Sequence, residues 1–106
     1  MSNASSTKEV LVAARWILEN VGWCQGKFSL WEGGKPVGFC PVGAVNRVEL
    51  DLLPAAGLKA GALGLLEDAM ISLAKKKTTV YQWNDDRKRT REQVLKAFDK
   101  AIKACP

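Results

Sequence analysis

Residues 81–92, YQWNDDRKRTRE, bring together side chains that could do binding chemistry. The stretch holds two aromatic residues, an asparagine, two aspartates and four basic residues. Arginines and amides hydrogen-bond anions and nucleic acid, and tryptophan rings stack on bases or sugars. Asn and Asp are also turn formers whose side chains bond their own backbone. The stretch is therefore either a binding loop or an entrance to the helix that follows, and the sequence leaves both interpretations open.

The cysteines are the candidate nucleophiles. Cys40 precedes Pro41, which suits the first position of a helix, so Cys40 is its expected N-cap and could have a lowered thiol pKa. The chain contains no histidine, so Asp85 or Asp86 would have to act as the base, and a carboxylate is a poor base for a thiol. We therefore expect a small buried thiol at Cys40 and keep a thiol-dependent enzyme as the second alternative.

Metal and cofactor sites are not expected. Without histidine there are no imidazole ligands, and the three cysteines, Cys24, Cys40 and Cys105, contain no C-x-x-C pair. Their odd number is typical of free thiols in a reducing compartment. The polar start MSNASSTKE and the lack of an apolar run of roughly 18 residues predict a cytoplasmic protein with no membrane partner.

The composition predicts one soluble domain. The 106 residues are 47% hydrophobic and 25% charged, which suits a single core. We expect a flexible tail over residues 1–6 and a helical domain over residues 7–106. The net charge of +5 permits an anionic partner without requiring one.

Capping signals and periodicity predict four helices and one hairpin. The first helix starts at a Ser6–Glu9 capping box and ends at Gly22, and a hairpin with a Gly-Gly turn follows over residues 23–39. The second helix runs from Pro41 to before Pro54, the third covers about residues 62–76, and the last begins at a Thr90–Gln93 capping box. The fold class is thus mostly α, with a small β-hairpin between the first two helices.

Apolar residues at helical spacing predict the core. Lys75, Lys76 and Lys77 are expected to form a solvated helix end. The predicted core positions are Val10, Leu11, Ala14, Ile17, Leu18 and Val21 in the first helix, Val42, Val45, Val48 and Leu52 in the second, Leu63, Leu66, Met70 and Leu73 in the third, and Val94, Leu95, Phe98, Ala101, Ile102 and Cys105 in the last.

Chain direction predicts where the unusual residues meet. Short connections favour antiparallel neighbours, so the hairpin base and the starts of the second and last helices share one end of the molecule, the pole. There, arginines and free helix N–H groups would meet an anion, Gln25 and Asn84 would hydrogen-bond it, and the tryptophans would exclude water. The expected function is a non-catalytic binding or interaction module with a ligand site formed by Trp23, Gln25, Cys40, Trp83, Asn84, Asp85, Arg87 and Arg91.

Two further partners remain open. A nucleic acid could bind the basic residues 87–91, but the adjacent Asp85 and Asp86 weaken this alternative, as does the spacing of Asp99 and Lys103, which is typical of self-paired surface charges. Trp16 and Val12 lie off the main apolar stripe of the first helix. Either the hairpin or a second copy of the chain in a homo-oligomer would cover them.

Three motifs together resemble a small family of uncharacterised bacterial and phage-associated proteins. They are GWCQG at residues 22–26, FCPVGAV at residues 39–45, and WNDDRKRTREQVLKAFDKAI at residues 83–102. The pattern they match is W-x-Q-G, then C-x-x-G-A, then W-N-D, R-T and E-V-L-x-x-F-D. The resemblance spans most of residues 9–104 and implies a domain of unknown function, with no catalytic residue to carry over.

Overall fold

The computed structural model of the chain describes residues 6–51 and 57–105. Helix α1 (Thr7–Asn20) begins where the Ser6 side chain accepts a hydrogen bond of 3.2 Å from the Glu9 N–H, as the capping signal predicts. The expected tail, except for Ser6, lies outside the described residues. The core face of α1 is confirmed at Val10, Leu11, Ala14 and Leu18, while Val21 lies after the last turn and is exposed.

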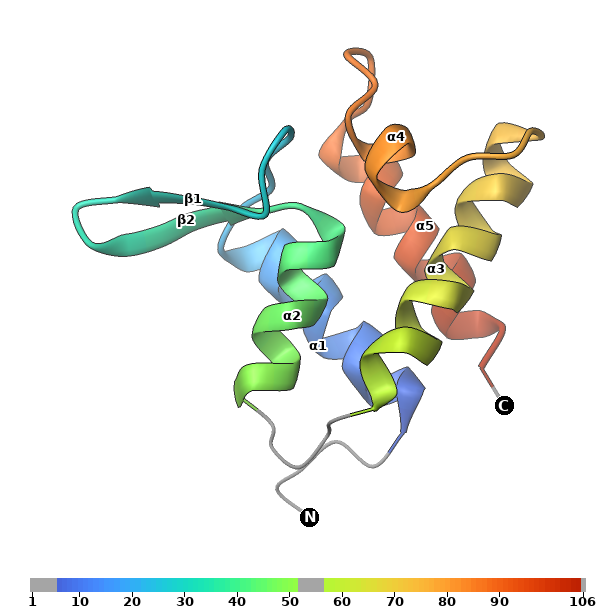
Figure 1. Cartoon of the computed structure of the whole chain (residues 1–106), viewed down its shortest axis with the longest axis horizontal. Helices are drawn as coiled ribbons and strands as arrows, with labels where there is room; N and C mark the ends of the chain where they lie inside the picture. The colour runs from blue at the N-terminus through green and yellow to red at the C-terminus, as the bar shows by residue number, and fades with distance from the viewer. Residues whose placement is uncertain (1–5, 52–56, 106) are drawn as a thin grey trace.

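The hairpin is confirmed between the first two helices. Strands β1 (Ser29–Glu32) and β2 (Lys35–Phe39) pair antiparallel around Gly33 and Gly34, whose φ angles of 58° and 79° suit a turn that glycine makes without strain. The hairpin projects sideways from the helices (Figure 1). It therefore leaves Phe28 and Trp31 about half exposed.

Helix α2 (Pro41–Asp51) buries Val42, Val45 and Val48 as predicted, and Leu52 lies outside the described residues. Helix α3 spans Leu58–Ala74 and starts earlier than the predicted residue 62, because Leu58 already packs against the core. The prediction that Leu73 is a core residue is wrong: it lies in the last turn of α3 and is 47% exposed.

Residues 81–92, expected to be a binding loop or the entrance to the next helix, begin instead with a short helix of their own, α4 (Val80–Asn84). The Thr79 side chain accepts from the Gln82 N–H, and the Gln82 side chain accepts from the Thr79 N–H, so a capping box starts this short helix. Five residues are too few to reveal a helical period. The described residues thus contain five helices, the last being α5 (Arg91–Lys103), whose predicted Thr90–Gln93 capping box is confirmed.

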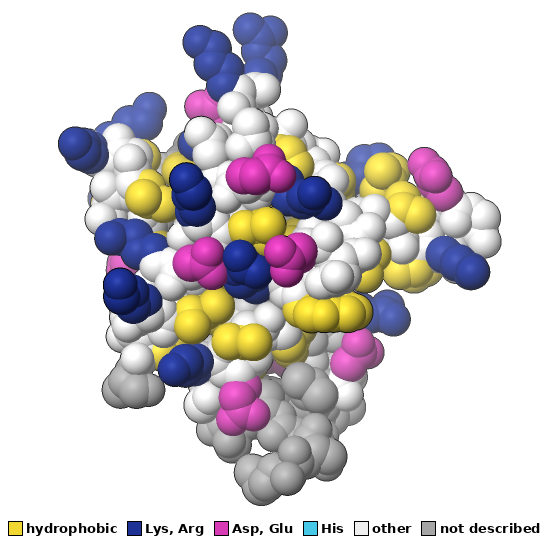
Figure 2. All heavy atoms as spheres, turned by 180° about the vertical axis from the view of Figure 1, so that it is seen from behind, with side chains coloured by type: hydrophobic (Ala, Val, Ile, Leu, Met, Phe, Trp, Pro, Cys, Tyr) yellow, Lys and Arg dark blue, Asp and Glu magenta, His cyan; other side chains and the backbone are white. Residues whose placement is uncertain are grey.

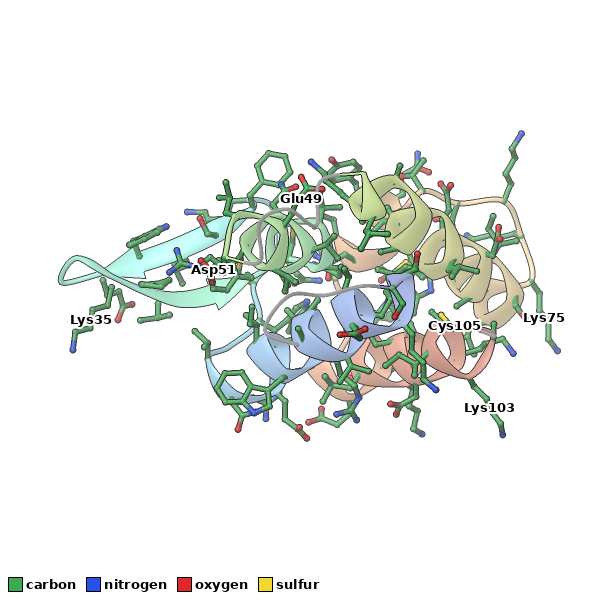
Figure 3. All side chains as sticks on the ribbon, turned by 90° about the horizontal axis from the view of Figure 1, so that it is seen from below. Lys35, Glu49, Asp51, Lys75, Lys103 and Cys105 are labelled. Atoms are coloured by element: carbon green, nitrogen blue, oxygen red, sulfur yellow. The ribbon has the colours of Figure 1, made fainter. Side chains whose placement is uncertain are left out.

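The chain follows the predicted route. Helix α1 leads to the hairpin, α2 descends, α3 climbs, and α5 descends from the end where α4 lies (Figure 1). From below, α2 and α3 form one layer and α1 and α5 the other, and Lys75 and Lys103 point away from both (Figure 3). The molecule is flat, with extents of 39 × 37 × 18 Å.

One hydrophobic core lies between the two layers. Leu11, Leu18, Leu66, Met70 and Phe98, from three helices, are its largest fully buried apolar side chains. No helix of the described residues combines the length and apolar character needed to cross a membrane.

One predicted ion pair, between Asp99 and Lys103, is wrong, because α1 packs on α5. Asp99 bonds the Arg15 guanidinium of α1 at 2.7 Å instead of pairing with Lys103.

Candidate ligand-binding pole

Asn84 joins the two segments that meet at the pole. Its side chain is 1% exposed and has hydrogen-bond partners at both of its polar atoms. Oδ1 accepts from the Trp23 indole N–H at 2.6 Å, and Nδ2 donates to the Cys24 carbonyl at 3.2 Å and the Asp85 carboxylate at 3.3 Å. The sequence prediction that these distant residues lie together at one end is therefore correct.

Gln25 and Asp85 extend the same connection. The Gln25 side-chain amide donates to the carbonyl oxygens of Asn84 and Asp86, both at 2.7 Å, and the Asp85 carboxylate accepts from the Gly26 N–H at 2.9 Å. The amide groups of Gln25 and Asn84, which the sequence analysis assigned to ligand binding, are thus engaged inside the protein. They hold the 22–26 segment against α4.

A pocket of about 150 Å³ opens beside this network. Its lining is mostly apolar, and Lys27 and Asp85 supply the charged side chains. The rings of Phe28 and Tyr81 meet edge to face, with centroids 6.1 Å apart and planes at 73°. The lining residues of this pole pocket are Gly26, Lys27, Phe28, Cys40, Pro41, Val42, Val80, Tyr81, Asn84 and Asp85.

Cys40 lies in the pocket wall and caps α2. It is 5% exposed, and its sulfur accepts a hydrogen bond from the Gly43 N–H at 3.3 Å. Burial raises the thiol pKa of Cys40 above its ordinary value, and this outweighs the lowering effect of the helix N–H groups. The buried thiol expected from the sequence is therefore found, and the thiol stays protonated at neutral pH.

The arginines lie apart from the pocket. Neither Arg87 nor Arg91 lines it, and Arg91 contacts Glu92 at 3.9 Å. Arg89 packs its guanidinium 3.7 Å from the centroid of the buried Trp83 ring and donates to the Trp83 carbonyl at 2.8 Å. Trp83 therefore belongs to the core, and Arg89 covers it.

The helix N-termini at the pole are largely occupied by their own caps. In α2, the Cys40 sulfur accepts a hydrogen bond from the Gly43 N–H, and the Cys40 carbonyl accepts one from the Ala44 N–H. In α5, the hydroxyl and carbonyl oxygens of Thr90 accept hydrogen bonds from N–H groups of the first turn in the same way. On the back face, basic side chains are interspersed with acidic ones (Figure 2). Some of the donors that motivated the expected anion site, namely the N–H groups of Gly43, Ala44 and Gln93, are therefore engaged within the protein.

The predicted site includes Cys40, Asn84 and Asp85 of the pocket lining but not Lys27, Phe28 or Tyr81. Exposed aromatic residues such as Phe28 and Tyr81 cannot be told from core residues by type alone, and no spacing rule connects the hairpin with α4. A detectable signal was the glycine of C-x-x-G-A: a Cβ on Gly43 would overlap the Phe28 carbonyl, so α2 and the Phe28 backbone approach as closely as they do only because residue 43 is glycine.

The remaining thiols are free. Cys24 is partly buried, which raises its pKa, and the neighbouring Cys40 raises it further. Cys105 packs against the core at the end of the chain's last helix, as predicted (Figure 3). No group of three or more His, Cys, Asp or Glu residues in the described part of the chain could hold a metal ion.

A family model described as a family of unknown function (DUF6197) matches residues 2–104. No curated protein and no solved structure matches the chain.

Proposed function

The chain belongs to the family of unknown function DUF6197, and we propose that it is a non-catalytic binding module whose pole pocket takes a small ligand or one side chain of a partner. The observation that best supports this proposal is the concave, mostly apolar pocket that opens beside two half-exposed aromatic residues, Phe28 and Tyr81. Pockets of this kind, with a few polar groups at the edge, are the usual form of ligand sites.

The pocket volume limits the ligand. A cavity of about 150 Å³ is large enough for one six-membered ring or one branched aliphatic group. A nucleotide or an oligosaccharide is much larger than this. The proposed ligand therefore inserts one apolar group and leaves the rest of its structure outside.

The thiol chemistry supports binding over catalysis. A thiol nucleophile works as the thiolate, yet burial raises the pKa of Cys40, and the chain has no histidine to act as its base. The free cysteines also support the proposal that the protein acts in the reducing environment of the cytoplasm.

An NMR titration with benzyl alcohol tests this proposal. We expect shifts concentrated at the backbone amides of Gly26, Val42 and Val80, with saturation in the millimolar range. Tyr81→Ala removes part of the pocket wall and should abolish the shifts. Leu73→Ala is the matched control, because Leu73 is 47% exposed against 51% for Tyr81 but lies outside the pocket. Shifts spread evenly over the surface, or equal shifts in both variants, would refute the pocket.

The homo-oligomer expected from the sequence is retained as a proposal. Trp16 is 59% exposed and Val12 48%, so the hairpin does not cover this face of α1. A groove lined by Ala13, Trp16, Ile17, Val48 and Asp51 adjoins it. Light scattering should give the mass of a dimer for the wild-type protein and the mass of a monomer for Trp16→Ser. A wild-type protein that stays monomeric at high concentration would contradict the homo-oligomer.

A further inference from the structure

We propose that the pole pocket selects an organic cation, an ammonium or guanidinium group attached to a small apolar body. This inference rests on the proposed binding function and adds the charge of the ligand. The basic composition of the chain suggests an anionic ligand, and the inferred ligand has the opposite charge. Three features of the pocket support this inference: the aromatic pair, a fixed carboxylate, and the small number of donors for an anion.

The aromatic pair offers two surfaces suited to a cation. The Phe28 and Tyr81 rings stand at 73° with centroids 6.1 Å apart, and each residue is about half exposed. The face of an aromatic ring carries partial negative charge, so rings set at a wide angle attract alkylated ammonium groups through their faces. An apolar cation loses little hydration at such a surface, unlike a compact anion.

Asp85 adds a full negative charge at the edge of the same pocket. Its Oδ1 is held by the Gly26 N–H at 2.9 Å and the Asn84 side-chain amide at 3.3 Å. Because Asn84 is itself buried and bonded to Trp23, the carboxylate is anchored to the core. Its second oxygen accepts no hydrogen bond within the described residues, so it can accept one from a ligand ammonium or guanidinium.

Lys27 is the one feature that opposes a cation. Its side chain lines the pocket and makes no ion pair within residues 6–51 and 57–105. Lysine carries its charge on a long flexible stem that can turn to solvent, whereas Asp85 is fixed by two hydrogen bonds. The fixed charge therefore determines the sign of the ligand, and Lys27 reduces the affinity.

An anion finds few donors here. The α2 N–H group of Gly43 bonds the Cys40 sulfur, that of Ala44 bonds the Cys40 carbonyl, and Pro41 has no N–H. Arg89 is held over Trp83. Among the charged side chains that line the pocket, only Lys27 would then favour a carboxylate or phosphate.

Three probes of one shape test the sign of the ligand. Choline carries a trimethylammonium group at one end and an alcohol at the other. 3,3-Dimethyl-1-butanol has a neutral tert-butyl group in place of the trimethylammonium group. 3,3-Dimethylbutanoate keeps the tert-butyl group and has a carboxylate in place of the alcohol. We expect choline to bind about tenfold more tightly than the alcohol, with the carboxylate weakest. The choline preference should shrink as salt is added.

Two variants that each remove one charge assign that preference to its residues. Asp85→Asn keeps an oxygen for the Gly26 N–H and should bring choline close to the alcohol. Lys27→Gln removes the opposing charge and should raise the ratio of choline affinity to alcohol affinity about threefold. Thermal melting of each variant establishes that it is folded, and Tyr81→Leu, which keeps the apolar wall without the ring, should reduce choline binding more than alcohol binding.

The outcomes separate this inference from the binding proposal. If the alcohol binds as tightly as choline, or the carboxylate binds best, the cation inference is wrong while the apolar pocket stands. If benzyl alcohol binds and choline does not, the inference is likewise wrong. If none of these probes binds, the binding function itself fails.

Discussion

The Trp23 indole nitrogen and the Asn84 side-chain oxygen, sixty-one residues apart in the chain, form a hydrogen bond of 2.6 Å. This contact links the segment after α1 to the end of α4. It is part of a buried set in which Asn84 also bonds the Cys24 carbonyl and the Asp85 carboxylate. The pole pocket depends on this link, because residues that follow each partner or precede it in the chain, such as Gly26 and Tyr81, line the pocket.

Asn84→Ala should therefore destabilise the fold. Removing the side chain leaves the Trp23 N–H and the Cys24 carbonyl without their partner in a mostly buried place, which costs about 2–4 kcal/mol of unfolding free energy. Urea unfolding followed by tryptophan fluorescence measures the loss. Asn20→Ala is the control, because Asn20 is exposed and its side chain donates to the Trp16 carbonyl alone among the described residues, so its cost should stay at about 0.5 kcal/mol. Equal losses would mean that the Asn84 network is not structural.

Gly43→Ala should damage the pocket as well as stability. The added methyl would overlap the Phe28 carbonyl backbone, so either α2 or the strand entry must move, at a cost of about 2–3 kcal/mol. Gly64→Ala in α3 is a matched change, since its methyl would point into open space and should stabilise by about 0.5–1 kcal/mol. The two thermal midpoints should move in opposite directions. A Gly43→Ala protein with unchanged stability and unchanged benzyl alcohol binding would contradict the close approach.

Arg89 and Arg87 should behave differently, although they are two residues apart. Arg89→Ala removes the cation–π contact and the hydrogen bond to the Trp83 carbonyl, which should cost about 1–2 kcal/mol of stability. Arg87 makes no ion pair in the described residues, so Arg87→Ala should cost at most about 0.5 kcal/mol.

This pair also separates folding from nucleic-acid binding. In a retardation assay at low salt, we expect no binding to single- or double-stranded DNA or RNA. Salt-dependent retardation that Arg87→Ala weakens without unfolding the protein would instead support the nucleic-acid alternative.

Reaction of the buried thiols should depend on pH in a fixed direction. Burial raises the pKa of Cys40 and of Cys24 above the ordinary 9.0, so each thiolate is scarcer at neutral pH than that of an exposed thiol. Iodoacetamide should modify both slowly at pH 7, and the rates should rise with pH beyond 9.0. Rapid alkylation of Cys40 at pH 7 in the folded protein would revive the thiol-enzyme alternative.

The same pKa shifts should reduce stability at alkaline pH. A thiol whose folded pKa exceeds its unfolded value stabilises the fold fully below the unfolded pKa, and that contribution is lost as pH rises through the folded value. The denaturation midpoint should therefore fall above about pH 9. The fall should be smaller in Cys40→Ser, which no longer has that titrating group.

Capping boxes and helical periodicity were enough to predict most of the fold. Ser6 and Thr90 begin α1 and α5 as predicted, because a cap is a local hydrogen bond that depends on residues three apart. The start of α3 and the exposure of Leu73 depend on which neighbours are available to pack, and a helical period does not contain that information.

The candidate site was only half predictable for the same reason. Chain direction correctly brings Trp23, Gln25, Cys40, Asn84 and Asp85 to one end. Whether a side chain faces a ligand or another part of the protein depends on geometry of a few ångströms. Gln25 and Asn84 turn inward, and Phe28 and Tyr81, which no motif marked, form the open wall.

A crystal structure of the protein grown with benzyl alcohol would test the central claim most directly. The binding account predicts electron density for one ring beside the Phe28 and Tyr81 pair, in contact with Val42 and Val80, and no such density in Tyr81→Ala crystals grown the same way. An empty pole pocket at a saturating concentration, with the ring bound only at another surface such as the Trp16 groove, would contradict it.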